Sequence, residues 1–173
     1  MRVGEFLTRS TIWIVLAGYA IGSTLFALSR KRPKWESVAR LAWTVACVSL
    51  LAHVASAFHF YYGWSEESAY RETARQTAAV VGLDWGGGLY LNYATVLFWV
   101  IDVTWWWRGL DAYRRRPTFL VVLWQCFLIF IIFNSTVVFK SGPLRWLGVC
   151  ISLVLACSWL HSWKQGPTRV GQE

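Results

Sequence analysis

Residues 118–139 read TFLVVLWQCFLIFIIFNSTVVF, a long apolar stretch that contains no charged residue. The hydrocarbon core of a bilayer is about 30 Å thick, and an α-helix needs about 20 apolar residues to cross it. Lipid offers no hydrogen bonds, so a spanning segment must satisfy its own backbone groups, as a helix does. The stretch therefore predicts a transmembrane helix.

Four other parts of the chain are also long and mostly apolar. Together the predicted spans cover residues 11–29, 38–60, 88–107, 118–139 and 144–163. Of the 173 residues, 56% are apolar and only 15% are charged, whereas soluble domains have about 25% charged residues. This composition excludes a disordered chain and a small disulfide-rich scaffold. We predict an all-α fold, a polytopic membrane bundle with five transmembrane helices that forms a single domain over residues 1–173.

The basic residues are divided unequally between the two sides of this bundle. Eleven of the 17 lie in the segments after the first, third and fifth spans, and six lie on the opposite side. Because loops rich in Lys and Arg stay in the cytoplasm, we expect the amino terminus outside and the carboxy terminus inside. The net charge of +8 then reflects topology and attraction to anionic lipid, and we expect no nucleic-acid partner.

The longest segment between two spans, residues 61–87, carries the signals of one more helix. Ser65 is a typical N-cap, the acids Glu66 and Glu67 suit a first helical turn, and Gly82 is a typical helix end. Between these caps, less polar residues recur three or four positions apart on one side of the expected helix, and polar residues lie on the other side. We predict an amphipathic helix over residues 65–82 on the outer surface.

The central third of the chain also resembles a known group of sequences. The residues that carry this resemblance are His59-Phe60-Tyr61-Tyr62-Gly63-Trp64-Ser65, Ala69-Tyr70, Thr73, Thr77, Trp85-Gly86-Gly87-Gly88-Leu89-Tyr90, Asn92-Tyr93, Asp102 and Trp105-Trp106-Trp107. They look like a family of uncharacterised bacterial multi-span integral membrane proteins without an assigned activity. The resemblance implies a location in the bacterial inner (plasma) membrane and no particular chemistry.

Small and polar residues mark the faces through which the predicted helices should pack. Gly18 and Gly22 in the first span clear a groove for another backbone. The second span has a face of small residues that runs from Ala39 through Ala42 and Ala46 to Ser56, and His53 lies within it. We expect this face to pack partly against the third span.

The third span has a polar face. Asn92, Thr95, Trp99 and Asp102 belong to a row of residues, spaced three or four apart, that runs from Gly88 to Trp106. Polar groups in lipid are costly, so this face should point into the bundle. Asp102 is a functional residue or one half of a structural ion pair, for which Arg108 and His161 are the expected partners.

These observations favour a binding or accessory subunit for a lipid-like or apolar ligand or a membrane partner, with enzyme activity uncertain and disfavoured. The candidate binding residues are His53, Asn92, Thr95, Trp99, Asp102 and Gln125. The candidate outer mouth, where an unspecified metal would have imidazole and carboxylate ligands, comprises His59, Glu66, Glu67, Asp84 and Trp85. The cofactor is unknown, and membrane lipids, a homo-oligomer or a larger membrane complex are the expected partners. The alternatives are an oligomeric small transporter or channel, and a haem or redox protein that uses His53 and His59.

Overall fold

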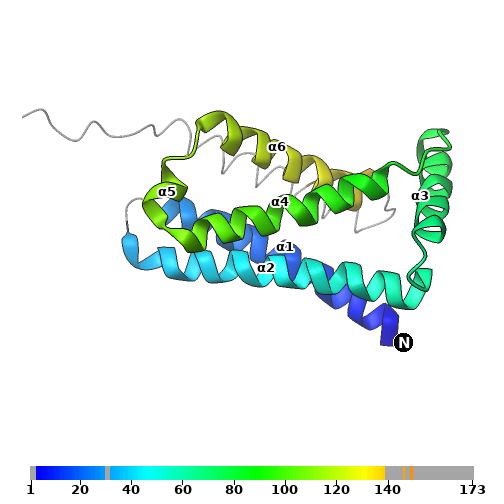
Figure 1. Ribbon diagram of the computed structural model, residues 1–173, viewed down its shortest axis with the longest axis horizontal. Helices are drawn as coiled ribbons and strands as arrows, with labels where there is room; N and C mark the ends of the chain where they lie inside the picture. The colour runs from blue at the N-terminus through cyan, green and yellow to red at the C-terminus, as the bar shows by residue number, and fades with distance from the viewer. Residues whose placement is uncertain (1–2, 30–31, 139–145, 147–148, 150–173) are drawn as a thin grey trace, which may run out of the picture. The chain divides into compact units, whose positions relative to one another are not determined.

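The computed structural model describes residues 3–29, 32–138, 146 and 149, and every regular element among them is a helix (Figure 1). The elements are α1 (Val3–Ser29), α2 (Glu36–Ala57), α3 (Glu66–Val81), α4 (Gly88–Arg108), α5 (Leu110–Arg114) and α6 (Thr118–Phe133). A 3-10 turn at Pro33–Trp35 precedes α2, and π-helical turns at Phe58–Tyr62 and Asn134–Val138 extend α2 and α6. The all-α prediction is confirmed.

Three helices in the described part are long and apolar enough to cross a membrane. They are Val3–Ser29, Pro33–Tyr62 and Thr118–Val138, which contain the first, second and most of the fourth predicted spans. The third predicted span is helical as α4, but Asn92, Asp102 and its many aromatic residues make it less apolar. The fifth predicted span, residues 144–163, lies outside the described residues except for two positions.

The chain divides into two compact units, residues 1–122 and 123–173. In the first unit α1 and α2 pack side by side in opposite directions (Figure 1). A Cβ atom on Gly18 would lie 2.8 Å from the Cβ of Ala46, and one on Gly22 would lie 3.0 Å from the Trp43 ring. Glycine therefore permits this close approach, as the Gly18 and Gly22 spacing predicted.

The small face of α2 consequently has a different neighbour from the one expected. Ala42 and Ala46 lie against Gly18 of α1, and His53 lies against Thr8 and Thr11 of the same helix. The helix α4 packs on α2 instead through Trp43, Thr44 and Arg40. The prediction that α2 and α4 pack through the small face of α2 is wrong, because the glycines of α1 fit that face more closely.

The helix α3 has the ends that the sequence predicts. The Ser65 hydroxyl accepts a hydrogen bond from the Ser68 backbone N–H at 3.2 Å, and Gly82 closes the helix in the left-handed conformation at φ 74°. The backbone of Gly86 then passes close to Tyr70 of α3, where a Cβ atom would lie 2.5 Å from the Tyr70 carbonyl oxygen. The glycines after α3 thus let the chain turn closely under the helix and enter α4.

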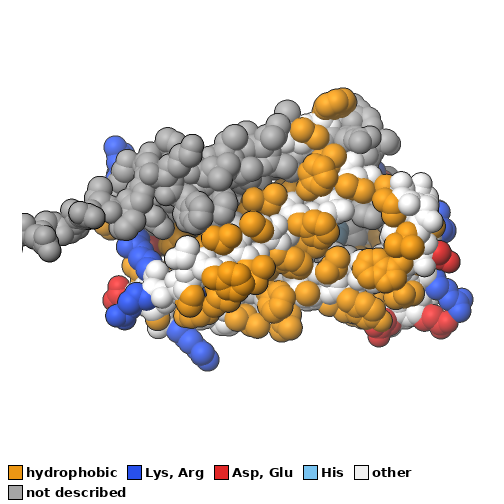
Figure 2. All heavy atoms as spheres, turned by 90° about the horizontal axis from the view of Figure 1, so that it is seen from above, with side chains coloured by type: hydrophobic (Ala, Val, Ile, Leu, Met, Phe, Trp, Pro, Cys, Tyr) orange, Lys and Arg blue, Asp and Glu red, His pale blue; other side chains and the backbone are white. Residues whose placement is uncertain are grey.

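Large apolar side chains remain exposed on the outward faces of α1, α2 and α4. Examples are Trp13 and Ile21 on α1, Leu41 on α2, and Leu97 and Ile101 on α4. Figure 2 shows hydrophobic side chains spread over the described part of the visible face, with charged side chains toward the two ends of that part. A surface of this kind suits lipid better than water.

Candidate functional site

The Asp102 carboxylate lies at the centre of a buried hydrogen-bond network at one end of the first unit. Its Oδ2 accepts hydrogen bonds from the indole N–H of Trp43 at 2.9 Å and from the Tyr113 hydroxyl at 3.0 Å. Its Oδ1 accepts one from the Arg116 guanidinium. These donors come from α2, from α5 and from the segment after α5, so one carboxylate ties three parts of the chain to α4.

A short helix that the sequence analysis missed brings Tyr113 and Arg116 to this carboxylate. Gly109 ends α4 and begins the turn into α5, and Arg116 then folds back so that its Nε donates to the Tyr113 carbonyl oxygen at 2.9 Å. The Arg116 guanidinium lies 3.4 Å from the centroid of the Tyr113 ring. Tyr113 in turn stacks on Trp106 of α4 at 4.6 Å with an interplanar angle of 9°.

The network has little contact with solvent. The Arg116 and Asp102 side chains are 9% and 6% exposed, and Phe26 of α1 packs edge-on against Trp106 and Tyr113. Burial, together with the nearby negative charge of Asp102, raises the pKa of Tyr113 well above its ordinary value. Tyr113 therefore stays protonated and remains a donor to the carboxylate.

The partner of Asp102 differs from the two that the sequence suggested. Arg116 makes the ion pair, whereas Arg108 is exposed and belongs to a different surface of α4. His161 lies outside the described residues. Sequence reasoning favoured Arg108 because it is close to Asp102 in the chain, and a turn that reverses direction after Gly109 has no periodic signal. The Gly109 and Pro117 pair that brackets α5 was the available clue.

The polar face predicted on α4 is buried except for one member. Thr95 donates to the Leu91 carbonyl oxygen of its own helix at 2.8 Å. Trp99 packs against Trp43 at 5.1 Å and Tyr19 at 6.2 Å between ring centroids. Asn92 is exposed. The structure therefore brings Trp99 and Asp102 together around Trp43, and Asn92 does not join them.

His53, another candidate binding residue, lies on α2 against α1, away from the Asp102 network. His53 Nδ1 is 3.0 Å from the carbonyl oxygen of Thr8 and 3.3 Å from the Thr11 hydroxyl. A carbonyl only accepts hydrogen bonds, so this contact places the ring proton on Nδ1. Gln125, the last candidate binding residue, is half-buried in α6 and belongs to the second unit.

The residues of the candidate outer mouth are exposed and form separate contacts. His59 lies against the Phe60 ring at 4.7 Å, and Glu67 pairs with Arg71 along α3. Glu66, Asp84 and Trp85 are also exposed. In the described part of the chain, no group of three or more His, Cys, Asp or Glu side chains is arranged to hold a metal ion.

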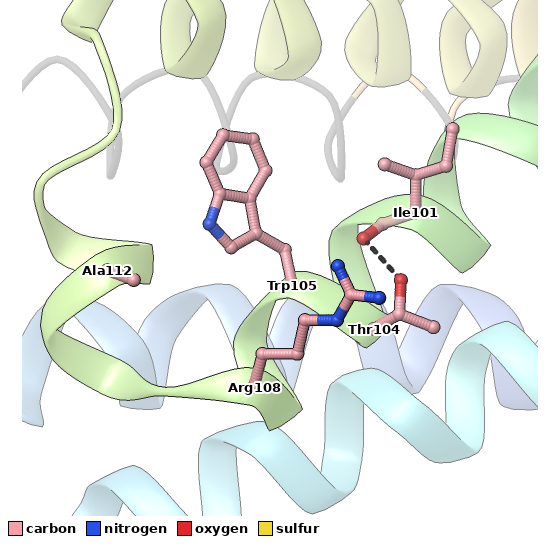
Figure 3. A pocket seen from close by; sticks show the side chains of 5 residues that line it. All are labelled: Ile101, Thr104, Trp105, Arg108 and Ala112. Carbon is pink, nitrogen blue, oxygen red and sulfur yellow. Dashed lines mark hydrogen bonds between the residues drawn. The ribbon is translucent and has the colours of Figure 1, made fainter.

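A groove between the end of α4 and α5 is a further site that the sequence analysis did not identify (Figure 3). It has a volume of about 240 Å³ and is lined by Ile101, Thr104, Trp105, Arg108 and Ala112. Figure 3 shows the Trp105 ring and the Arg108 guanidinium rising from α4 around this opening, while Ala112 faces it from α5. An aromatic N–H, a guanidinium and an aliphatic wall are thus combined in one half-open site.

Comparisons with family models, with curated proteins and with solved structures find no match to this chain. The class that the fold and site define is an all-helical protein with three candidate membrane spans and a buried, internally paired carboxylate.

Proposed function

We propose that the chain is an integral membrane protein of the bacterial inner membrane that acts as a binding or accessory subunit. It crosses the bilayer five times, through α1, α2, α4, α6 and residues 144–163. It belongs with the bacterial multi-span proteins that its central third resembles. Its ligand is lipid-like or apolar, or is another membrane protein.

One observation carries this proposal: the buried charge is satisfied inside the protein, while the apolar surface faces outward. Asp102 accepts from Trp43, Tyr113 and Arg116, so it is held in place and neutralised. Large apolar side chains, by contrast, are exposed along α1, α2 and α4. A hydrogen-bonded interior together with an apolar exterior supports a protein that binds through its surface.

The same arrangement argues against a path for ions that is lined by Asp102. A carboxylate in such a path must exchange its partners with each passing ion. The Asp102 carboxylate is held by three donors, and the paired Arg116 side chain is only 9% exposed. A channel or carrier function would therefore require the network that joins α2, α4 and α5 to open.

The distribution of charge supports the proposed orientation. Arg40 at the beginning of α2 lies 4.2 Å from the Trp107 ring centroid at the end of α4, and Arg114 lies near Glu36 and Ser29. The basic residues of these segments therefore gather at one end, which we place in the cytoplasm. Impermeant labelling of single-cysteine variants on intact cells tests this: a cysteine at Ser68 should react and one at Lys34 should not. The opposite pattern would reverse the topology.

Native mass spectrometry of the purified protein tests the accessory function. We expect a copurifying lipid or a second protein at fixed stoichiometry. A ring of identical subunits that carries neither would instead support the transporter or channel. An absorption spectrum of the same sample tests the haem alternative, because a Soret band would overturn the proposal in favour of a redox protein.

A further inference from the structure

We propose that the groove between α4 and α5 binds the phosphate headgroup of an anionic glycerophospholipid from the leaflet at the basic end of the bundle. This inference rests on the proposed membrane function and names the ligand of one surface site. The groove is the one lined by Ile101, Thr104, Trp105, Arg108 and Ala112. Its occupant is a lipid because an apolar surface continues from the charged part of the site along α4.

The charged part of the site is the guanidinium of Arg108, which has no acidic partner among the residues that the structure describes. Among the described residues, no ion pair or hydrogen bond involves the Arg108 side chain. Arg116, which lies 5.8 Å from the Trp105 ring centroid, is occupied by Asp102. The planar guanidinium of an Arg side chain presents paired N–H groups that match phosphate oxygens. Arg108 is therefore the group available to an anionic headgroup.

The other charges near the groove are of both signs. Arg115 is exposed, and its Nε donates to the Asp111 carbonyl oxygen at 3.3 Å. Asp111 is also exposed on α5, and its carboxylate opposes the binding of an anion. Arg114 is paired with Glu36 at 4.0 Å and Arg116 with Asp102. Arg108 and Arg115 therefore remain against the single acid Asp111, so the local potential favours a negatively charged ligand.

The apolar part of the site has the spacing and length for an acyl chain. Leu97 and Ile101 are 57% and 47% exposed and lie one helical turn apart on the way to Arg108. With about 1.5 Å of rise per residue, the row from Leu97 to Arg108 extends over about 16 Å, about half of the hydrocarbon thickness of a bilayer. A chain from one leaflet can thus lie along α4 while its phosphate reaches the guanidinium.

Trp105 places this site at the depth of the headgroups. Tryptophan prefers the interface between lipid and water, where the ring is in the apolar region and its N–H reaches polar groups. The groove volume of about 240 Å³ is several times the share of about 30 Å³ that one water takes in the liquid. It therefore admits a phosphodiester beside Trp105 but not a whole lipid.

The test uses native mass spectrometry of the full chain in detergent with added phosphatidylglycerol or phosphatidylcholine of the same acyl chains. We expect wild type to retain phosphatidylglycerol preferentially and Arg108→Gln to reduce this preference about tenfold, the size of one charge-assisted interaction. The matched control is Arg9→Gln, which removes an exposed cation at the opposite end of the bundle, on α1. An equal reduction by both variants would show general attraction to charge and would overturn the inference.

Two further measurements keep the inference testable. Ala112→Phe fills the groove from an exposed position without changing the charge, and it should reduce phosphatidylglycerol retention as Arg108→Gln does. Excess inorganic phosphate should leave lipid retention unchanged, and displacement by phosphate would show a site for a free anion instead. A ring of identical subunits that carries no copurifying lipid or partner but still prefers added phosphatidylglycerol would overturn the accessory function alone. Equal retention of both added lipids would overturn only the lipid site.

Discussion

Two Arg–carboxylate pairs in the first unit have the same chemistry and opposite surroundings. Arg116 and Asp102 are 9% and 6% exposed, and two further donors hold the carboxylate. Arg75 and Glu72 on α3 are 72% and 32% exposed, and Arg75 donates to Glu72 at 2.6 and 2.8 Å. Water competes for the second pair and is excluded from the first. The comparison teaches that burial, rather than distance, decides what each pair contributes to the fold.

The largest expected effect is the loss of one charge from the buried pair. Arg116→Met leaves the Asp102 carboxylate buried without its counter-charge, so we expect it to lower the free energy of unfolding by about 3–5 kcal/mol. Denaturant unfolding in micelles, followed by tryptophan fluorescence, measures this loss. Arg75→Met on α3 is the matched control and should cost less than about 1 kcal/mol. Equal losses for the two variants would contradict the comparison.

A double variant sharpens this result. Asp102→Asn combined with Arg116→Met removes both charges, so its loss should be smaller than the sum of the losses of the two single variants. Additive losses would show that the two side chains act independently, against the contact between them.

The second-largest effect is expected where α1 and α2 pack most closely. Gly18→Val puts a side chain where even a Cβ atom would lie 2.8 Å from the Ala46 Cβ and 2.9 Å from the Ala42 carbonyl oxygen. We expect a loss of about 1–3 kcal/mol in the free energy of unfolding. Ala17→Val, at an exposed position of the same helix, is the control and should change the same measurement little.

The third effect is confined to α3, the helix that carries the exposed Arg75–Glu72 pair. Ser65→Ala removes the hydroxyl that accepts from the Ser68 N–H, and an N-cap of this kind contributes about 1 kcal/mol. Amide hydrogen exchange should become faster in α3 and stay unchanged in α4. Ser68→Ala, which removes a hydroxyl but leaves the cap, should leave both rates unchanged, and a matching acceleration in that variant would refute the capping role.

The smallest effect is the pH dependence of the exposed pair. Hydrogen bonds from Arg75 and Gln76 lower the pKa of Glu72 from 4.5 to about 2. Because the folded pKa is the lower one, the contribution of this pair is complete above pH 4.5 and is lost as the pH falls toward 2. An NMR titration of the Glu72 carboxyl group measures the shift, which Arg75→Gln should largely abolish. A titration unchanged by that variant would assign the shift to another cause.

The helix α3 was easier to predict from the sequence than the buried Asp102 network, because the signals for its two ends are local. Ser65, the acids of the first turn and Gly82 lie within one short stretch, and they predicted the helix to within one residue at each end. The buried end depends on contacts between distant residues. Trp43 is 59 positions from Asp102, and Arg116 is 14 positions away beyond a reversal of the chain.

Helical periodicity predicted which face of α4 is buried but not what lies against it. Thr95, Trp99 and Asp102 share the buried face, as their spacing indicated. The predicted partner for the small face of α2 was α4, whereas the structure places α1 there. The spacing of Gly18 and Gly22 on α1 and that of Ala42 and Ala46 on α2 do not show that the two faces fit each other. The fit between two small faces is a property of the pair of helices, so the sequence of one helix does not identify the helix that packs against it.

The order of residues along the chain gives the Asp102 network a sequence of assembly. Chains are synthesised from the amino terminus, so the residues of α1 and α2 are made before those of α4. Of the three donors to the carboxylate, Trp43 alone precedes Asp102, while Tyr113 and Arg116 follow it. During synthesis, Trp43 is therefore the only one of these donors already present when Asp102 is made, and Arg116, which carries the counter-charge, is the last to be added. The network can be complete only after the α5 turn has formed.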